Sequence, residues 1–251
     1  MPASYDPQLY ALVHRGNAGD SQFYEAACAG AQSVLELGCG YGRLIPALVK
    51  GGARYLGLDL DPGLLSLAAR ARKQLAASVR ARITLSQGDM RTFRLPTRFE
   101  RIVLPHSGLY CLASDRDVLR CLKRVRAQLS DDGELVLDAY NADGFHGEAD
   151  EESMSGKERD PITQVEADGV RYQVFERTRW RKPQQLIVSY EYESPSGEKH
   201  TGRIRHRYLL RAQLEQLLTT AGLCPTLIAG SFMGARHTRR SEHLVLRARR
   251  L

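Results

Sequence analysis

The sequence lacks the features that mark secreted, membrane-spanning and metal-stabilised proteins. Its 251 residues include only five cysteines, an odd number, and no two of them form a Cys-x-x-Cys pair. We therefore expect neither a disulfide framework nor a structural metal site, and we expect a reducing, cytoplasmic setting. No apolar run approaches the length of about 18 residues that spans a membrane, and the N-terminal residues show no signal-peptide pattern.

Aromatic residues are scarce, at 7%, and they are not interleaved with a long basic run. The 36 Lys and Arg residues nevertheless exceed the 29 Asp and Glu residues, which gives a net charge of +7. Nucleic-acid-binding proteins usually concentrate such charge in patches with aromatic neighbours. We assign the excess to a solvated arginine-rich surface, with an acidic substrate as the alternative, and nucleic acid is not the expected partner.

Strand-like and helix-like patterns alternate through the first 140 residues. Short apolar runs predict buried strands at Ser33–Leu37, Tyr55–Leu60, Arg82–Leu85, Ile102–Leu104 and Glu134–Leu137. Helical patterns occupy two pieces within the first 30 residues, separated by Gly16–Asp20, and then Arg43–Val49 and Gly63–Ser78. A further helix starts at Asp115 or Asp117 and runs to about Leu129. Asp20 or Ser21 can cap the second piece, and Asp132-Gly133 is expected to turn the chain into the fifth strand. The alternation predicts a parallel sheet with helices on both faces.

The pattern changes after Asn141. Residues 143–160 are acidic and contain glycine, which is typical of a mobile loop. Further segments predict strands at Val170–Thr178, Gln185–Glu193 and Thr201–Leu210, a helix at Arg211–Ala221, and closing strands at Leu223–Ala229 and His243–Arg247. We expect one domain from residues 1–141 and 208–251, with an N-terminal helical cap, and a β-rich insert or lid at 142–207. We also consider a homodimer formed through this insert.

A glycine-rich turn follows the first predicted strand. Gly38, Gly40 and Gly42 are spaced G-x-G-x-G, and a turn of this kind before a helix directs backbone N–H groups at a ligand. Dinucleotides are bound by a different spacing, G-x-G-x-x-G. Glu36 precedes the turn, where a carboxylate repels a pyrophosphate but can receive the ammonium group of a methionine moiety. The segment therefore favours S-adenosylmethionine over a nicotinamide cofactor.

Acidic residues follow the next two predicted strands. Asp59 ends the second strand, where a carboxylate can accept hydrogen bonds from both ribose hydroxyls. Asp61, next to Pro62, is better placed to cap the following helix. Asp89 can accept a hydrogen bond from an adenine amino group, with a turn residue as its alternative role, and Met90 can line the adenine ring.

These motifs resemble the successive cofactor motifs of class I S-adenosylmethionine-dependent methyltransferases. The resembling segments are Glu36–Gly42, Gly57–Asp59, Gly88–Arg91, Phe99–Tyr110, Asp132–Asp138 and Leu217–Leu223. The β-rich insert before the last helix is similar to glycine/sarcosine and amino-sugar N-methyltransferases. The resemblance implies an α/β, Rossmann-like, seven-stranded doubly wound sheet, mostly parallel with the last strand antiparallel, and an antiparallel β insert. Glu100 and His106 depart from the family pattern, and His106 is a candidate for substrate specificity.

The predicted cofactor contacts lie along these motifs and in the N-terminal helices. They are Tyr24, Glu36, Gly38, Cys39, Gly40, Arg43, Asp59, Leu60, Asp89, Met90 and Leu104. No residues show metal-ligand spacing, so S-adenosylmethionine is the one cofactor that we expect.

Residues beyond the fourth and fifth strands are the candidates for the acceptor side, because ligands of open α/β sheets collect there. His106 is expected to act as a base or substrate contact, with a satisfied polar loop residue as the alternative. Tyr110 is the second candidate catalytic residue, with core packing as its alternative. The predicted substrate contacts are Tyr10, His106, Tyr140, Asn141 and Arg205. Arg205 belongs to an alternating arginine series that can equally be a solvated strand edge.

The sequence thus predicts a methyltransferase enzyme that transfers a methyl group from S-adenosylmethionine to N or O of a small molecule. One alternative is a methyltransferase acting on RNA or protein, which the positive charge motivates. Another is a methyltransferase-like fold that binds a nucleoside or partner without catalysis, against which the intact Glu36, Asp59 and Asp89 argue. A nicotinamide-dependent reductase is disfavoured by the glycine spacing.

Overall fold

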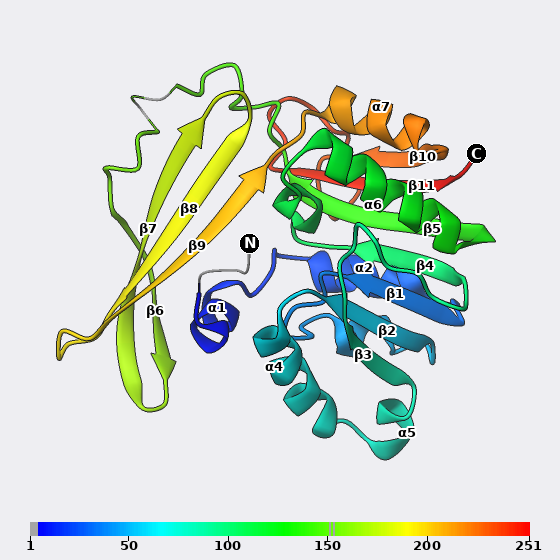
Figure 1. The fold of residues 1–251 in the computed structure, drawn as a ribbon, viewed down its shortest axis with the longest axis horizontal. Helices are drawn as coiled ribbons and strands as arrows, with labels where there is room; N and C mark the ends of the chain where they lie inside the picture. The colour runs from blue at the N-terminus through cyan, green and yellow to red at the C-terminus, as the bar shows by residue number, and fades with distance from the viewer. Residues whose placement is uncertain (1–4, 151, 153) are drawn as a thin grey trace. The chain divides into compact units, whose positions relative to one another are not determined.

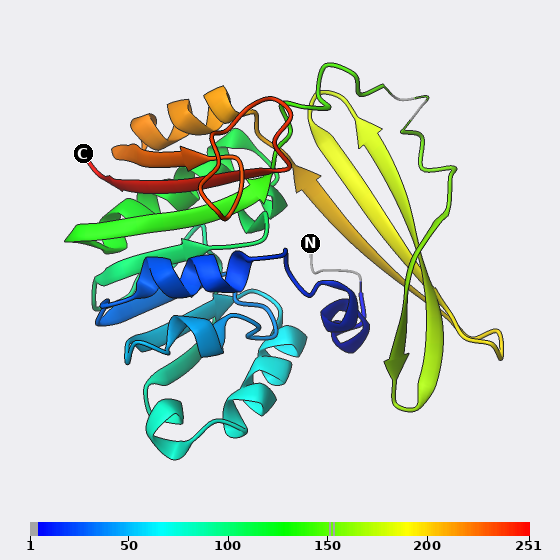
Figure 2. The ribbon, with the colours of Figure 1, turned by 180° about the vertical axis from the view of Figure 1, so that it is seen from behind.

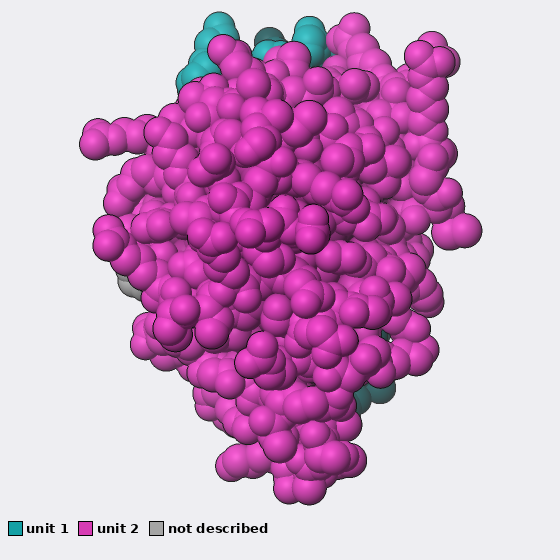
Figure 3. Space-filling view, turned by 90° about the vertical axis from the view of Figure 1, so that its right-hand side faces the viewer, with its two compact units in different colours: residues 1–15, 145–208 teal, residues 16–144, 209–251 magenta. Residues whose placement is uncertain are grey.

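The computed structural model describes residues 5–150, 152 and 154–251. The chain divides into two compact units, each discontinuous in sequence (Figure 3). The larger, here called the α/β unit, consists of residues 16–144 and 209–251. The smaller, here called the β unit, contains the described residues of 1–15 together with those of 145–208.

The α/β unit is built on a seven-stranded sheet in the order β10-β11-β5-β4-β1-β2-β3 (Figure 1). The strands are β1 (Ser33–Leu37), β2 (Arg54–Asp59), β3 (Ile83–Gln87), β4 (Phe99–Leu104), β5 (Leu129–Tyr140), β10 (Leu223–Ala229) and β11 (His243–Arg250). The pairs β1–β2, β1–β4, β2–β3 and β4–β5 are parallel, whereas β11 is antiparallel to both of its neighbours. The predicted Rossmann-like sheet with an antiparallel last strand is confirmed.

Helices cover both faces of this sheet. They are α2 (Asp20–Cys28), α3 (Ile45–Leu48), α4 (Pro62–Lys73), α5 (Ala77–Arg80), α6 (Asp115–Gln128) and α7 (Arg211–Thr220), with a 3-10 helix η1 (Gly108–Cys111). Figures 1 and 2 show α6 over one face and α2 over the other. Because both faces are covered, β1 is buried at every position, which is the reason for its nearly continuous apolar run.

Some predicted helix boundaries are wrong for local reasons. The helix expected at Arg43–Val49 is only the short α3. The glycine turn extends further than expected, since the Ile45 N–H still donates to the Gly42 carbonyl, and the helix begins only at Ile45. Neither Asp20 nor Ser21 caps α2; Gly19 occupies the cap position, and the Asp20 carboxylate is bound elsewhere. The helix expected at Gly63–Ser78 is divided into α4 and α5. The predicted Asp61 cap of α4 is confirmed, since its side chain accepts from two N–H groups of the first turn.

The turn expected at Asp132-Gly133 is also wrong. These residues lie inside β5, at an irregularity in its pairing with β4. While β4 advances from Phe99 to Arg101, its partner residue on β5 moves from Leu129 to Glu134. The additional residues of β5 leave the ladder as a bulge, so turn-forming residues are accommodated within a strand.

The β unit is a four-stranded antiparallel sheet in the order β6-β7-β8-β9. Its strands are β6 (Asp160–Ala167), β7 (Val170–Arg181), β8 (Gln185–Glu193) and β9 (Lys199–Arg207). Only three strands are expected from the sequence. The edge strand β6 is missed because Val165 is its one buried residue, so the strand shows no apolar alternation.

Helix α1 (Pro7–Val13) belongs to the β unit. Its buried residue Leu9 forms a core with Val165, Tyr172, Val174 and Tyr192 of the sheet. This apolar contact places the helix with the insert and not with the larger domain, to which the sequence interpretation assigns it. Among the described residues, no helix combines the length and the apolarity needed to cross a membrane.

Candidate functional site

The glycine-rich turn after β1 is attached to the end of β2. The N–H groups of Gly38 and Cys39 both donate to the Leu58 carbonyl, at 2.7 and 3.1 Å. Gly38 and Gly40 have φ angles of 73° and 53°, in the left-handed region that glycine adopts most easily. The sequence therefore places two conformationally permissive residues at the carboxyl ends of the central strands, where ligands of such sheets bind.

Asp59, the last residue of β2, is bound to this turn. Its Oδ2 accepts a hydrogen bond from the Gly40 N–H at 2.7 Å, and its Oδ1 accepts from the Asp61 N–H at 2.8 Å. Burial raises the pKa of Asp59. Each oxygen retains a further acceptor site, so the carboxylate can also bind a pair of hydroxyls. The neighbouring Leu60 is 56% exposed and offers an apolar surface at the same strand end.

Glu36 is buried within β1. It is 2% exposed and accepts a 2.5 Å hydrogen bond from the Tyr55 hydroxyl on β2. Burial raises the pKa of Glu36 to about 8, although the Tyr55 hydrogen bond and the charge of Arg43 lower it. The carboxyl group is therefore mostly protonated at pH 7, and a ligand ammonium close to it would favour its charged form.

An ion pair holds the segment that follows the turn. The two terminal nitrogens of Arg43 donate to the two carboxylate oxygens of Asp20, at 2.9 and 2.7 Å. Asp20 is 2% exposed and lies in the first turn of α2, so the pair joins α2 to the turn. The guanidinium also lies against Gly16, where an added Cβ would be 2.2 Å from Arg43 Nη1. Arg43, a predicted cofactor contact, is thus engaged with Asp20.

Three residues meet where β4 and β5 end. Asp138, which is 1% exposed, accepts hydrogen bonds through Oδ1 from the Tyr24 hydroxyl at 2.6 Å and from the His106 backbone N–H at 2.8 Å. Its Oδ2 is buried and has no hydrogen-bond partner in the part of the chain that is described. Burial raises the pKa of Asp138 and lowers the pKa of His106. An unsatisfied buried oxygen is costly, so Oδ2 can accept a hydrogen bond from a ligand donor.

The loop that carries His106 is strained. His106 and Ser107 have φ angles of 53° and 58°, unusual for residues other than glycine. Two bonds hold this conformation: the Ser107 N–H donates to the Asp138 carbonyl, and the Tyr140 N–H donates to Ser107 Oγ, both at 3.0 Å. Backbone strain of this kind concentrates at functional sites.

Tyr110 is fully buried beside this loop. Its hydroxyl donates to the Leu209 carbonyl at 3.0 Å, and its ring packs edge-on against Tyr140 at 5.0 Å. Burial raises the pKa of its hydroxyl. These contacts agree with the core-packing alternative, and a catalytic role of Tyr110 stays a prediction.

Asp89 is held by its own loop. Arg91 donates to both carboxylate oxygens, with distances from 2.6 to 3.0 Å, and this pairing lowers the pKa of Asp89. The Met90 side chain reaches the glycine turn, since a Cβ added at Gly38 would be 3.7 Å from Met90 Cε. Met90 is therefore near Gly38, whereas adenine binding by Asp89 stays a prediction.

The remaining predicted residues occupy varied environments. Tyr24, Cys39 and Leu104 are buried in the α/β unit. Asn141 donates through its amide to three carbonyls, those of residues 238, 239 and 241, and so fixes the segment before β11. Tyr10 and Arg205 belong to the β unit, where Tyr10 stacks on His14 with ring centroids 4.0 Å apart. Their substrate contacts stay predictions.

Sequence reasoning missed Tyr55 and Ser107. Tyr55 looks like an ordinary strand residue, and only the β1–β2 register brings its hydroxyl to Glu36. Ser107 lies within the resembling segment Phe99–Tyr110, but its residue type gave no signal of a role. Among the described residues, no cluster of three or more His, Cys, Asp or Glu could hold a metal ion, and all five cysteines are free.

Comparisons with known proteins find a family model and relatives that are methyltransferases. Residues 34–133 match the family model described as a methyltransferase domain. An N,N-dimethyltransferase of dTDP-3-amino-3,6-dideoxy-alpha-D-glucopyranose from Streptomyces fradiae is 28% identical over 141 residues, which cover 53% of this chain and 52% of that protein. The matches thus span about half the length of the curated relatives.

Solved methyltransferase structures share the fold over almost the whole chain. The CcbJ methyltransferase from Streptomyces caelestis is 22% identical, with a TM-score of 0.76, over 92% of this chain and 89% of that one. An S-adenosylmethionine-dependent methyltransferase from Clostridium acetobutylicum is 14% identical, with a TM-score of 0.78, over 96% of both chains. The second sheet is included in an alignment of this extent, so the insert is part of the shared fold.

Proposed function

We propose that this chain, in which residues 34–133 match a methyltransferase domain, is an S-adenosylmethionine-dependent methyltransferase that methylates an amino group of a small molecule. The observation that carries the proposal is the attachment of the glycine turn to Asp59 through the 2.7 Å bond from the Gly40 N–H. It supports the proposal because the turn and a carboxylate that can accept hydrogen bonds from ribose hydroxyls lie together at the strand ends.

The residues of this site fit the chemical groups of S-adenosylmethionine. Asp59 accepts hydrogen bonds from the two ribose hydroxyls. The exposed Leu60, and Met90 beside Gly38, provide apolar surface for the adenine. Glu36, in its ionised form, compensates the charge of the cofactor's ammonium group, which lies on the other side of the glycine turn. When bound, S-adenosylmethionine supplies an electrophilic methyl group; the protein's task is to position the acceptor and exclude water.

His106 accepts a proton from the acceptor amine, and Asp138 orients that amine. An amine attacks only when it is neutral, so a proton must leave it. His106 has a pKa lowered by burial, is neutral at pH 7 and can take that proton. The free Oδ2 of Asp138 accepts a hydrogen bond from the acceptor N–H and fixes the direction of its lone pair.

An amino sugar is the acceptor class that we propose. The relative from Streptomyces fradiae bears the name of an enzyme that dimethylates a sugar amine. A small polar amine also suits the pairing of a buried carboxylate oxygen with a neutral imidazole, because each contacts a different hydrogen of the nitrogen.

Calorimetric titration tests the cofactor assignment. We expect S-adenosylmethionine and S-adenosylhomocysteine to bind and NADH not to bind. Absence of binding by both adenosyl ligands would overturn the proposal. Methyl transfer to a panel of amino sugars, with the corresponding hydroxy sugars as controls, then tests the choice of nitrogen over oxygen.

The homodimer through the β insert and the cytoplasmic location stay predictions. Sedimentation velocity of the full chain measures the first. A monomer at all protein concentrations tested would contradict it.

A further inference from the structure

One face of the four-stranded sheet carries two rows of arginine. Alternate residues of a strand share a face, and directly paired residues of neighbouring strands share it too. The register pairs residues 177, 179 and 181 of β7 with 189, 187 and 185 of β8, and these with 203, 205 and 207 of β9. The six arginines of the two outer rows are Arg177, Arg179, Arg181, Arg203, Arg205 and Arg207.

This face is opposite to the one that packs on α1. The core with α1 uses Tyr172 and Val174 of β7, which alternate with the arginines along the strand. The arginine face is solvent-accessible, since Arg179, Arg181 and Arg205 are exposed. Its charge is therefore available to a ligand.

The central strand β8 provides a neutral floor between the rows. Its residues on this face are Gln185, Ile187 and Ser189. The rows are two strand spacings apart, about 9 to 10 Å, and neighbouring arginines within a row are about 7 Å apart. A cavity of about 530 Å³ lies here, lined by the floor and by five of the six arginines. Its volume falls in the range of small-molecule sites.

Among the residues that the structure describes, most of this positive charge has no carboxylate partner. Arg177 is paired with Glu191 at 2.7 Å, and Arg207 donates to the Tyr208 carbonyl at 2.7 Å. The other four guanidinium groups have no carboxylate partner in the described chain. Like charges at this spacing repel one another, so an anion between the rows would relieve the repulsion and accept several charge-assisted hydrogen bonds.

We propose that this cavity is a binding site for a compact polyphosphate, either free or as the phosphate chain of a nucleotide. Guanidinium groups match the oxygens of phosphate in pairs, and two facing rows can hold successive phosphates from both sides. This proposal does not rest on the proposed methyl-transfer function.

The shape of the cavity favours a compact anion over a nucleic-acid strand. Glu191 lies on the same face at one end and is paired with Arg177 and Arg159, so this end offers no uncompensated positive charge to a continuing backbone. Tyr190 is the one aromatic residue that lines it, so successive bases find no stacking platform.

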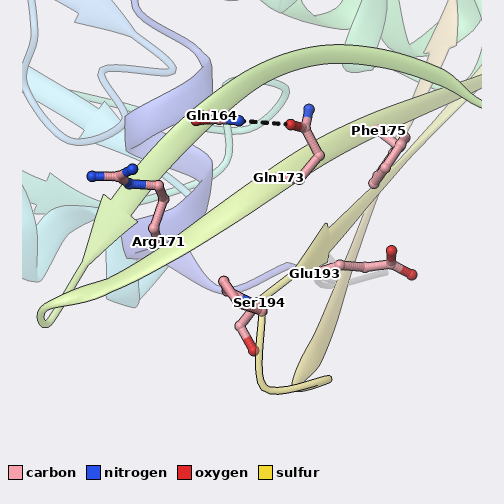
Figure 4. A pocket seen from close by; sticks show the side chains of 7 residues that line it. Gln164, Arg171, Gln173, Phe175, Glu193 and Ser194 are labelled. Carbon is pink, nitrogen blue, oxygen red and sulfur yellow. Dashed lines mark hydrogen bonds between the residues drawn. The ribbon is translucent and has the colours of Figure 1, made fainter.

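A second pocket on the same face provides a contrast. It is about 260 Å³ and is lined by Gln164, Arg171, Gln173, Phe175, Glu193 and two neighbouring residues (Figure 4). Gln164 and Gln173 bond to each other at 3.1 Å, and Glu193 pairs with Arg159 and Lys199. One arginine beside a carboxylate does not make an anion site, so Arg171 is a matched control on the same strand and face.

The test is calorimetric titration of the full chain with inorganic tripolyphosphate, and separately with ADP. The double variant Arg179→Gln/Arg205→Gln should weaken tripolyphosphate binding at least ~10-fold, because it removes two charge-assisted contacts. Arg171→Gln should change it by less than ~2-fold, and the thermal unfolding of all variants should match the parent. ADP binding that is tighter than tripolyphosphate binding and is weakened by Arg179→Gln/Arg205→Gln would identify a nucleotide as the source of the phosphates.

Several results would overturn the proposal. The first is no tripolyphosphate binding at millimolar concentration. The second is a loss of tripolyphosphate affinity in Arg171→Gln as large as that in Arg179→Gln/Arg205→Gln. The third is tight binding of a single-stranded oligonucleotide that tripolyphosphate does not displace. Failure of S-adenosylmethionine to bind would leave this site unaffected, so the two proposals fail independently.

Discussion

The hydroxyl of Tyr24 donates a 2.6 Å hydrogen bond to Asp138, a residue 114 positions away in the sequence. Tyr24 comes from α2 and Asp138 from β5, and both side chains are buried. Within the described part of the chain, the bond satisfies Oδ1 of Asp138 while Oδ2 has no hydrogen-bond partner, so Oδ2 is the oxygen left to accept a hydrogen bond from a ligand.

Tyr24→Phe should destabilise the protein by about 1 to 3 kcal/mol, because a buried carboxylate loses one of its two donors. Urea unfolding measures the change. Tyr172→Phe is the matched control, since that hydroxyl makes a 3.3 Å contact with Glu198, a partly exposed partner, and its loss should cost less than about 0.5 kcal/mol. Equal effects of the two substitutions would show that the Asp138 bond is not special.

Asp59→Ala should weaken S-adenosylmethionine binding at least ~10-fold through the loss of charge-assisted hydrogen bonds. Asp61→Ala is the control two residues away. It removes the cap of α4 and should reduce stability by about 1 kcal/mol while leaving the affinity nearly unchanged. Calorimetry and urea unfolding separate the two effects. Unchanged affinity in Asp59→Ala would remove this residue from the site.

Glu36 should make the ligand-free protein less stable as the pH rises. Its pKa is about 8 in the folded protein and near 4.5 when the chain is unfolded, so the folded state retains a proton that the unfolded state releases between these values. The stabilisation is fully present below pH 4.5 and declines up to about pH 8, with a slope of up to ~1.4 kcal/mol per pH unit.

Glu36→Gln should abolish this part of the pH dependence, because glutamine has no titrating proton and can still accept from the Tyr55 hydroxyl. The measurement is urea unfolding of parent and variant from pH 5 to pH 8. The difference between the two curves isolates Glu36 from other buried carboxyl groups. Parallel curves would contradict the prediction.

Asp20→Asn should cost about 2 to 4 kcal/mol of folding stability, because it leaves the Arg43 guanidinium poorly compensated. Arg43 is 20% exposed, so the cost should be below that of a fully buried pair. A double-mutant cycle with Arg43→Gln should give a coupling energy well above that of the exposed pair Lys50–Glu25, for which about 0.5 kcal/mol is expected. Equal coupling energies in the two cycles would reject a structural role of the Arg43–Asp20 ion pair.

The sequence was sufficient for the features that depend on neighbouring residues. The G-x-G-x-G turn, the Asp61-Pro62 helix start and the alternating apolar runs are local, so their elements and order could be predicted. The edge strand β6 and the bulge at Asp132-Gly133 could not, since exposure and pairing with another strand decide them.

The same distinction holds for the candidate site. The sequence by itself determined which chemical groups lie at the strand ends, namely Glu36, Asp59 and His106. Only the tertiary structure decided their states. Burial of Glu36 raises its pKa, Asp20 binds Arg43, and one oxygen of Asp138 has no hydrogen-bond partner among the described residues. Desolvation and hydrogen-bond satisfaction depend on the atoms that surround a group, and those atoms come from distant parts of the chain.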